Sequence, residues 1–167
     1  MTIDLQLDHL VPLDNDLDRF GIGVIGAGFI VRDCHLLAYQ QAGFRVLGIA
    51  SRTPERAEEV AKLREIPQVY RTWQELLENP ETEVIDVGVP PQHQPAIIRE
   101  IASRGRHVRG ILAQQPLAMS YAEASGLVGA SEDAGITLAV NQNMRHDQSV
   151  RACRYILQRG LLGAPVL

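Results

Sequence analysis

Short apolar runs alternate with longer amphipathic segments along the chain from residue 20 onward. Apolar runs bounded by glycine or proline are typical of buried strands, and apolar residues at helical spacing are typical of helices packed on a sheet. The expected strands cover residues 21–25, 44–50, 68–70, 84–89, 107–113 and 136–140. The expected helices cover residues 29–41, 54–64, 73–79, 94–103, 121–134 and 147–159.

This alternation predicts an α/β fold with helices on both faces of a parallel sheet. Because crossover connections are right-handed, we expect a doubly wound sheet with strand order 3-2-1-4-5-6. Ligands of such sheets bind beyond the carboxyl ends of the strands, where the first and fourth strands meet. We expect Thr53, Thr72 and Ser120 to cap helices, and Glu123 to complete a capping box with Ser120.

Three segments divide the chain: an arm over residues 1–19, a sheet domain over residues 20–143, and a segment over residues 144–167 that holds the last expected helix and the start of a further domain. The arm has alternating apolar residues that Pro12 interrupts. It is either a solvated arm or a segment exchanged with a second subunit, and we favour the solvated arm.

The turn Gly26-Ala27-Gly28 joins the first expected strand to the first expected helix. A first glycine permits the tight turn, and a second lets a pyrophosphate approach the backbone N–H groups at the helix start. Val31 stands where a third small residue is usual. In this strand–turn–helix context the glycines predict dinucleotide binding.

The second expected strand is followed by Ser51 and Arg52, and no acid occurs before Glu55. NAD binding usually needs an acidic side chain here for the ribose hydroxyls, whereas arginine suits the 2′-phosphate of NADP. The sequence therefore favours NADP over NAD, and both remain open. The missing acid also argues against a methyltransferase.

The charge and the composition of the chain argue against several other classes of protein. The net charge of −4 equals that of residues 1–20, which carry five aspartates and one arginine. A formally neutral remainder argues against nucleic-acid binding, and no run approaches the roughly 18 apolar residues of a membrane span. The acidic start lacks the features of a secretory or transit peptide, so we expect a cytoplasmic protein. The spacing of Cys34, Cys153 and the histidines is not that of metal ligands, so no metal is expected. We expect His35, in the first helix, to pack or to cap.

Five stretches together resemble the N-terminal domain of the glucose–fructose oxidoreductase/inositol dehydrogenase/rhizopine-catabolism family, known as Gfo/Idh/MocA. They read GIGVIGAGFI at 21–30, VLGIASRTPERA at 46–57, VIDVGVPPQHQPAII at 84–98, GRHVRGILAQQPLAMSYAEA at 105–124 and VNQNMR at 140–145. The resemblance implies a Rossmann fold and hydride transfer between a nicotinamide and a carbon bearing a hydroxyl, often on a sugar or polyol. It also implies a set of dinucleotide contacts: Gly26, Gly28, Phe29, Ile30, Ser51, Arg52, Val89, Pro90, Gln92, His93, Gln114 and Asn141.

The chain departs from the family at the catalytic motif. Gln114-Gln115-Pro116 stands where the family has Glu-Lys-Pro, so Gln115 occupies the position of the lysine that exchanges a proton with the substrate. An amide has no titratable proton near neutral pH, and the chain's single lysine, Lys62, lies in another helix. His93 or His146 could replace it, His93 being the histidine expected beside the cofactor.

The family's C-terminal α+β domain, which carries the substrate site, is expected to be absent. Whether the chain is an enzyme therefore stays open at this point. We expect the cofactor domain of an oxidoreductase that is inactive alone, and the alternative is a non-catalytic dinucleotide-binding or subunit-interaction module. A minimal enzyme that uses His93 as acid and base is the third possibility. Self-association into a homo-oligomer is also possible, because apolar surface would be left uncovered.

Overall fold

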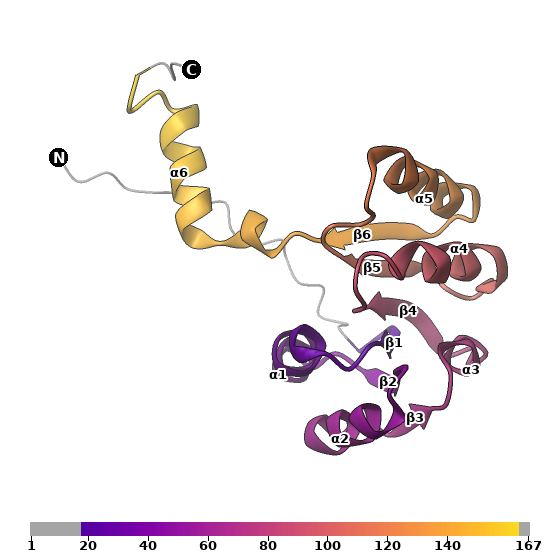
Figure 1. Ribbon diagram of the computed structural model, residues 1–167. Helices are drawn as coiled ribbons and strands as arrows, with labels where there is room; N and C mark the ends of the chain where they lie inside the picture. Colours follow the sequence, from indigo (N-terminus) through magenta and orange to yellow (C-terminus); the bar gives the residue numbers. More distant parts are fainter. Residues whose placement is uncertain (1–17, 164–167) are drawn as a thin grey trace. The chain divides into compact units, whose positions relative to one another are not determined.

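A six-stranded parallel sheet forms the centre of the fold, and the computed structural model describes residues 18–163 (Figure 1). The strand order is β3-β2-β1-β4-β5-β6, as the sequence predicts. The strands are β1 Gly21–Ile25, β2 Val46–Ala50, β3 Gln68–Tyr70, β4 Thr82–Val87, β5 Gly110–Gln114 and β6 Thr137–Asn141. Most of the expected arm, residues 1–17, lies outside the described residues.

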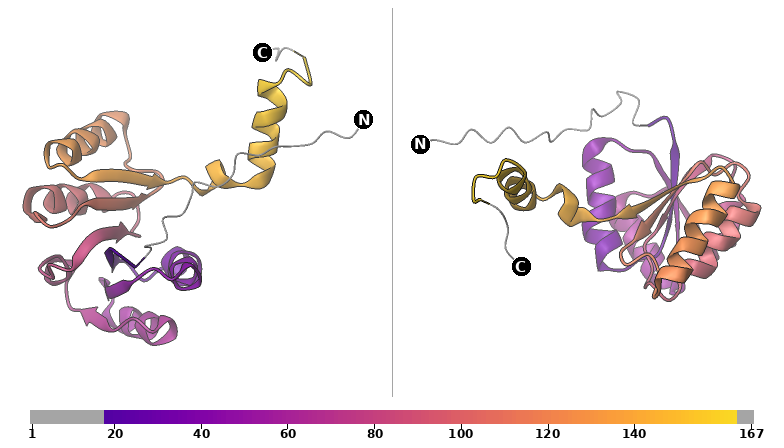
Figure 2. Two further views of the ribbon diagram at one scale, coloured as in Figure 1. Left: turned by 180° about the vertical axis from the view of Figure 1, so that it is seen from behind. Right: turned by 90° about the horizontal axis from the view of Figure 1, so that it is seen from above.

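Helices cover both faces of the sheet and produce three layers (Figure 2). Helices α1 and α2 lie on one face, and α3, α4 and α5 lie on the other. The helices are η1 Ile30–His35, α1 Leu36–Ala42, α2 Pro54–Arg64, α3 Trp73–Leu77, α4 Gln94–Arg104, α5 Tyr121–Asp133, η2 Asn143–His146 and α6 Gln148–Gln158. The fold class predicted from the alternation is confirmed.

Each face of the sheet has its own hydrophobic core. Successive residues of a strand point to opposite faces, so Val24 joins the core beneath α1 and α2 while Ile25 joins the core beneath α3, α4 and α5. In β4, Ile85 and Val87 stand on either side of Asp86, and both belong to the core beneath α3, α4 and α5. The side chain of Asp86, between them, is fully buried and contacts residues of the α1 side.

Several predicted boundaries are wrong by two or three residues, because buried apolar residues also occur in turns. The fifth strand begins at Gly110 rather than at residue 107. Val108 is buried, yet its N–H donates to the carbonyl oxygen of Gly105 at 2.9 Å within a turn. The fourth strand covers Thr82–Val87, so Val89 lies in the loop that follows it. The first helix opens with the π-helical segment η1, which the apolar spacing does not predict.

Two of the predicted helix caps are confirmed. The hydroxyls of Thr72 and Ser120 each accept a hydrogen bond from the backbone N–H three residues later, at 3.1 and 3.2 Å. The capping box at Ser120 is only half formed, because the Glu123 carboxylate pairs with Arg99 at 3.7 Å. The two bonds fix the residues at which α3 and α5 begin.

The residues fall into two compact units, and the sheet unit ends at Asn141. In the other unit, α6 begins at an Asp147 cap whose carboxylate accepts from the N–H groups of Ser149 and Val150. None of the helices within residues 18–163 is long and apolar enough to cross a membrane.

Candidate functional site

The predicted site residues gather at one edge of the sheet. Because all neighbouring strands are parallel, their carboxyl ends meet at the same edge. The predicted residues lie at these strand ends or in the loops and helix starts that follow them: Gly26, Gly28, Phe29, Ile30, Ser51, Arg52, Val89, Pro90, Gln92, His93, Gln114, Gln115 and Asn141.

The turn after β1 is held tightly against the ends of β2 and β4. Gly26 has a φ of +119°, and a Cβ at this position would lie 2.4 Å from the carbonyl oxygen of Gly88. The Gly26 N–H donates to the carbonyl oxygen of Ala50, and the Gly88 N–H donates to that of Ile25, both at 2.8 Å. Only glycine has both the conformation and the size that this contact requires.

The second glycine of the turn, Gly28, is surrounded by open space. A Cβ at Gly28 would have no heavy atom within 4 Å, although Gly28 stands at the beginning of the helical run. The next two side chains, Phe29 and Ile30, are 66% and 45% exposed. The first N–H groups of a helix have no partner inside the helix, so this turn combines free space with backbone donors, as a diphosphate requires.

Ser51 and Arg52 directly follow β2, so they lie at the same edge of the sheet. The Ser51 hydroxyl accepts a hydrogen bond from the Thr53 N–H at 3.2 Å. Thr53 occupies the N-cap position of α2 without any side-chain cap bond, so the predicted Thr53 cap is wrong. Arg52 is exposed and forms no ion pair within the described part of the chain, which leaves its guanidinium available to an anionic ligand.

A buried glutamine holds the segment that contains Gln115. The Gln94 amide nitrogen donates to the carbonyl oxygens of Gln114 and Pro116, both at 3.0 Å, and its oxygen accepts from the Gln114 N–H at 2.7 Å. Gln94 is fully buried, whereas Gln115 is exposed, and the Gln115–Pro116 peptide is cis. The sequence pattern gives no sign of Gln94. Its side-chain amide replaces a backbone partner at Gln114, where the pairing of β5 with β4 has ended.

His35 forms a buried pair with Asp86. The Nδ1 atom of His35 lies 2.7 Å from Oδ2 of Asp86, and both side chains are at least nine-tenths buried. The Tyr39 hydroxyl donates to the same carboxylate oxygen at 2.9 Å. Burial raises the pKa of the Tyr39 hydroxyl well above its usual value, and the Asp86 charge raises it further, so Tyr39 remains a donor.

The other ring nitrogen of His35 joins two predicted cofactor contacts. Its Nε2 atom lies 2.8 Å from Nε2 of Gln114 at the end of β5 and 2.8 Å from Nδ2 of Asn141 at the end of β6. The expected packing role accounts for the burial of His35 but not for these contacts. The structure thus adds His35, Tyr39 and Asp86 to the predicted edge.

The predicted residues after β4 do not enter this network. A Cβ at Gly26 would lie 3.5 Å from the Val89 side chain, so Val89 is beside the first turn. His93 is exposed at the N-cap of α4 and makes no side-chain cap bond. His146 belongs to the other compact unit. Among residues 18–163, the His93 side chain has no hydrogen-bond or ion-pair partner that would prepare it as an acid or a base.

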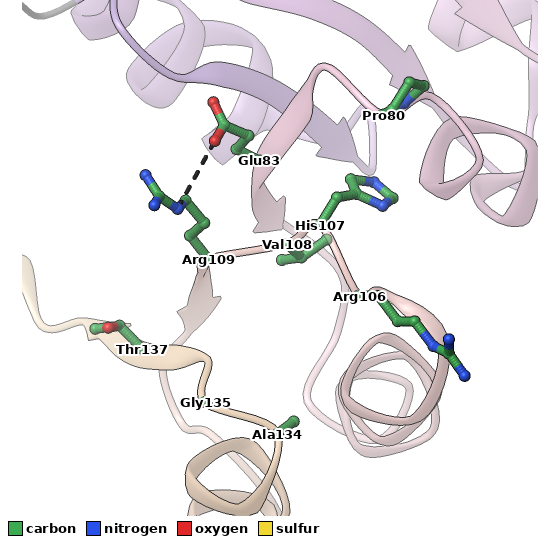
Figure 3. A pocket seen from close by; sticks show the side chains of 9 residues that line it. All are labelled: Pro80, Glu83, Arg106, His107, Val108, Arg109, Ala134, Gly135 and Thr137. Atoms are coloured by element: carbon green, nitrogen blue, oxygen red, sulfur yellow. Dashed lines mark ion pairs between the residues drawn. The ribbon is translucent and has the colours of Figure 1, made fainter.

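A separate pocket opens at the opposite edge, at the amino ends of β4, β5 and β6 (Figure 3). It is lined by Arg106, His107 and Arg109 among others, and Arg109 pairs with Glu83 at 3.8 Å. Figure 3 shows the Arg106 side chain directed away from Arg109, so the basic groups do not converge. None of the predicted site residues lines this pocket.

The model of the Gfo/Idh/MocA oxidoreductase family, described as having an NAD-binding Rossmann fold, matches residues 20–142. This chain belongs to that family. The match begins just before β1, ends just after β6, and contains the turn, the Gln114-Gln115-Pro116 segment and the His35 network. The resemblance inferred from the five sequence stretches is confirmed.

Relatives of known activity carry the same domain. The chain is 31% identical over 143 residues to a trans-1,2-dihydrobenzene-1,2-diol dehydrogenase of Oryctolagus cuniculus, covering 84% of this chain and 42% of the relative. The fold is similar to that of a 3-ketoreductase variant from Actinomadura kijaniata, solved with TDP-benzene and NADP (TM-score 0.78, 25% identity, 87% of this chain and 44% of that one).

The fold is also similar to that of an oxidoreductase from Agrobacterium radiobacter, solved with NAD+, L-tartaric acid and magnesium. Its TM-score is 0.77 at 25% identity, with 87% of this chain and 42% of that chain covered. The Gfo/Idh/MocA relatives thus include structures with either dinucleotide. The chain spans less than half the length of these relatives.

Proposed function

We propose that this Gfo/Idh/MocA domain binds NADP or NAD at the carboxyl edge of its sheet, as the cofactor domain of an oxidoreductase. The observation that carries the proposal is the open turn at Gly28, where a Cβ would meet nothing within 4 Å. This space lies at the start of the helical run, beside the rigid Gly26 contact with β4. A ligand that needs backbone N–H donors and close approach fits this arrangement.

Each part of the edge has a separate role in the proposed site. Gly26, Gly28, Phe29 and Ile30 would line the diphosphate, and Ser51 with Arg52 would hold the adenosine ribose. Val89, Pro90, Gln92 and His93 would lie along the nicotinamide half, where Gln114 would meet the ribose and Asn141 would close the pocket. When bound, the nicotinamide supplies a hydride donor or acceptor for a carbon that bears a hydroxyl.

Arg52 supports a preference for NADP. It is exposed, it has no ion-pair partner among residues 18–163, and it directly follows the half-buried Ser51 at the end of β2. A guanidinium recognises a phosphate with several N–H donors, while no carboxylate stands here to accept from the two hydroxyls of an NAD ribose.

Gln115 supports a binding role rather than catalysis by this domain alone. The side chain is exposed at the position of the family's lysine and is placed there by the Gln94 bonds on either side of it. It can orient a substrate hydroxyl but cannot exchange a proton with it. Hydride transfer on a sugar or polyol is the reaction proposed for the oxidoreductase; the alternative is a non-catalytic dinucleotide-binding or subunit-interaction module.

Titration calorimetry with NADP+ and NAD+ tests the proposed binding. We expect saturable heats and a rise in melting temperature, since a ligand at 100 times its Kd stabilises the native state by about 2.7 kcal/mol. Nicotinamide mononucleotide, which lacks the adenosine half, serves as the control and should bind much more weakly. Absence of both heat and thermal shift with either dinucleotide at millimolar concentration overturns the proposal.

Replacing Arg52 with alanine tests the preference between the two dinucleotides. A hydrogen bond to a charged group contributes about 1.5–3 kcal/mol, so the Kd for NADP+ should rise roughly tenfold or more. The Kd for NAD+ should change by less than about twofold, because its ribose carries no phosphate for Arg52 to hold. Arg56→Ala, which removes another exposed arginine at the start of α2, is the matched control. Equal losses for both dinucleotides would contradict the preference.

A further inference from the structure

We infer that His35 is a positioning residue of the cofactor site, which turns the amides of Gln114 and Asn141 so that their carbonyl oxygens accept hydrogen bonds from the nicotinamide-side ribose. This inference rests on the proposed function, because it concerns the same edge of the sheet. It adds the last residue of η1 to a site otherwise built from strand ends and from the loops and helix starts that follow them.

The buried carboxylate of Asp86 determines which nitrogen of His35 carries the proton. A carboxylate only accepts hydrogen bonds, and its Oδ2 atom already accepts from the Tyr39 hydroxyl. At 2.7 Å from the same oxygen, Nδ1 of His35 must therefore be the protonated nitrogen and donate. In a neutral imidazole the remaining nitrogen, Nε2, is then an acceptor.

An acceptor at Nε2 determines the orientation of both amides. Of the two ends of a side-chain amide, only the NH₂ group can donate to a ring nitrogen. The nitrogens of Gln114 and Asn141 are in fact the atoms found 2.8 Å from Nε2. The reversed amides would place two carbonyl oxygens against the lone pair of His35, which is repulsive. Chemistry therefore selects one orientation for each amide.

The carbonyl oxygens are left free as acceptors. Within the described part of the chain, Oε1 of Gln114 and Oδ1 of Asn141 have no hydrogen-bond partner. Neither oxygen is among the buried side-chain atoms that lack a partner, so both reach solvent. Ribose hydroxyls can donate, and two adjacent acceptors at the ends of β5 and β6 match a vicinal diol.

A comparison of whole and half ligands separates this role from a merely structural one. His35→Phe keeps a ring of similar size but removes both hydrogen-bonding nitrogens. We expect the Kd of the preferred dinucleotide to rise about tenfold, as for the loss of one or two hydrogen bonds. The Kd of its adenosine half, 2′,5′-ADP for NADP+ or ADP for NAD+, should stay within about twofold, because it lacks the second ribose.

Two further variants complete the experiment. His35→Gln can present an amide oxygen to the NH₂ groups and should recover part of the affinity for the whole dinucleotide. Leu36→Ala removes a buried side chain next to His35 that cannot form a hydrogen bond with either amide. It should lower stability without changing the ratio of the two Kd values. Equal losses of whole and half ligand in His35→Phe, or no loss of either, would overturn the inference while leaving the proposed function intact.

A ligand-free measurement tests the same inference. Nitrogen-15 NMR of the wild-type protein should show His35 protonated at Nδ1, with side-chain NH₂ signals of Gln114 and Asn141 that shift in His35→Phe. A proton on Nε2 would overturn the inference even if the dinucleotide binds. Failure of the wild-type protein to bind the adenosine half would instead count against the proposed function.

Discussion

Replacing Gly26 with alanine is expected to destabilise the native state by roughly 2–5 kcal/mol. A non-glycine residue held at an unfavourable φ costs about 1–3 kcal/mol, and Gly26 has a φ of +119°. The new Cβ would also lie 2.4 Å from the Gly88 carbonyl oxygen. That backbone cannot withdraw easily, because the Gly88 N–H is bonded to Ile25. Urea denaturation measures the loss as a lower midpoint at an unchanged slope.

Gly28→Ala is the matched control for this prediction, two residues along the same turn. Its Cβ meets no heavy atom within 4 Å, so the free energy of unfolding should change by less than about 0.5 kcal/mol. Dinucleotide affinity should nevertheless fall, because the added methyl group occupies the space assigned to the diphosphate. Similar stability losses in the two variants would show that Gly26 has no special role in the β1–β4 contact.

Replacing Asp86 with alanine is expected to cost about 3 kcal/mol or more of unfolding free energy. The carboxylate accepts from both His35 and Tyr39, and each buried donor left without a partner costs about 1–3 kcal/mol. The substitution also leaves a cavity between the sheet and α1. Thermal and urea unfolding followed by circular dichroism would measure this loss.

Two variants define what the loss at Asp86 means. Asp86→Asn keeps one carbonyl acceptor and should lose less stability than Asp86→Ala. Asp133→Ala, at the exposed end of α5, removes a carboxylate with no hydrogen-bond or ion-pair partner among the described residues and should be near neutral. An Asp86→Ala protein as stable as Asp133→Ala would mean that the buried hydrogen bonds do not hold this edge together.

The order of the strands could be predicted from the sequence because it depends on local patterns and chirality. The apolar runs, the glycine turn and the caps at Thr72 and Ser120 are each determined by a few consecutive residues. Boundaries such as the start of β5 were less predictable. A buried valine in a turn, such as Val108, cannot be distinguished by sequence from a buried valine in a strand. Whether Thr53 or Ser51 would hold the start of α2 depends on side-chain geometry that spacing does not contain.

The His35 network was missed, although its sequence signal existed. Asp86 is the only polar residue of the expected strand 84–89, and a buried aspartate requires a polar partner, since buried charges are almost always paired. The partner lies 51 residues earlier, in a helix whose register against the strand only the folded structure provides. Gln94 was missed for the same reason: its contacts with the backbone around Gln115 are 20 and 22 residues distant.

The spacing of the His35 contacts has a consequence for synthesis on the ribosome. The histidine is made early, while its partners follow 51, 79 and 106 residues later. The nascent chain can therefore bury the imidazole against the aspartate before the last β-segment has left the exit tunnel. Because each amide has its own hydrogen bond to Nε2, the Gln114 amide can take its direction before β6 has emerged, and the Asn141 amide takes its direction last.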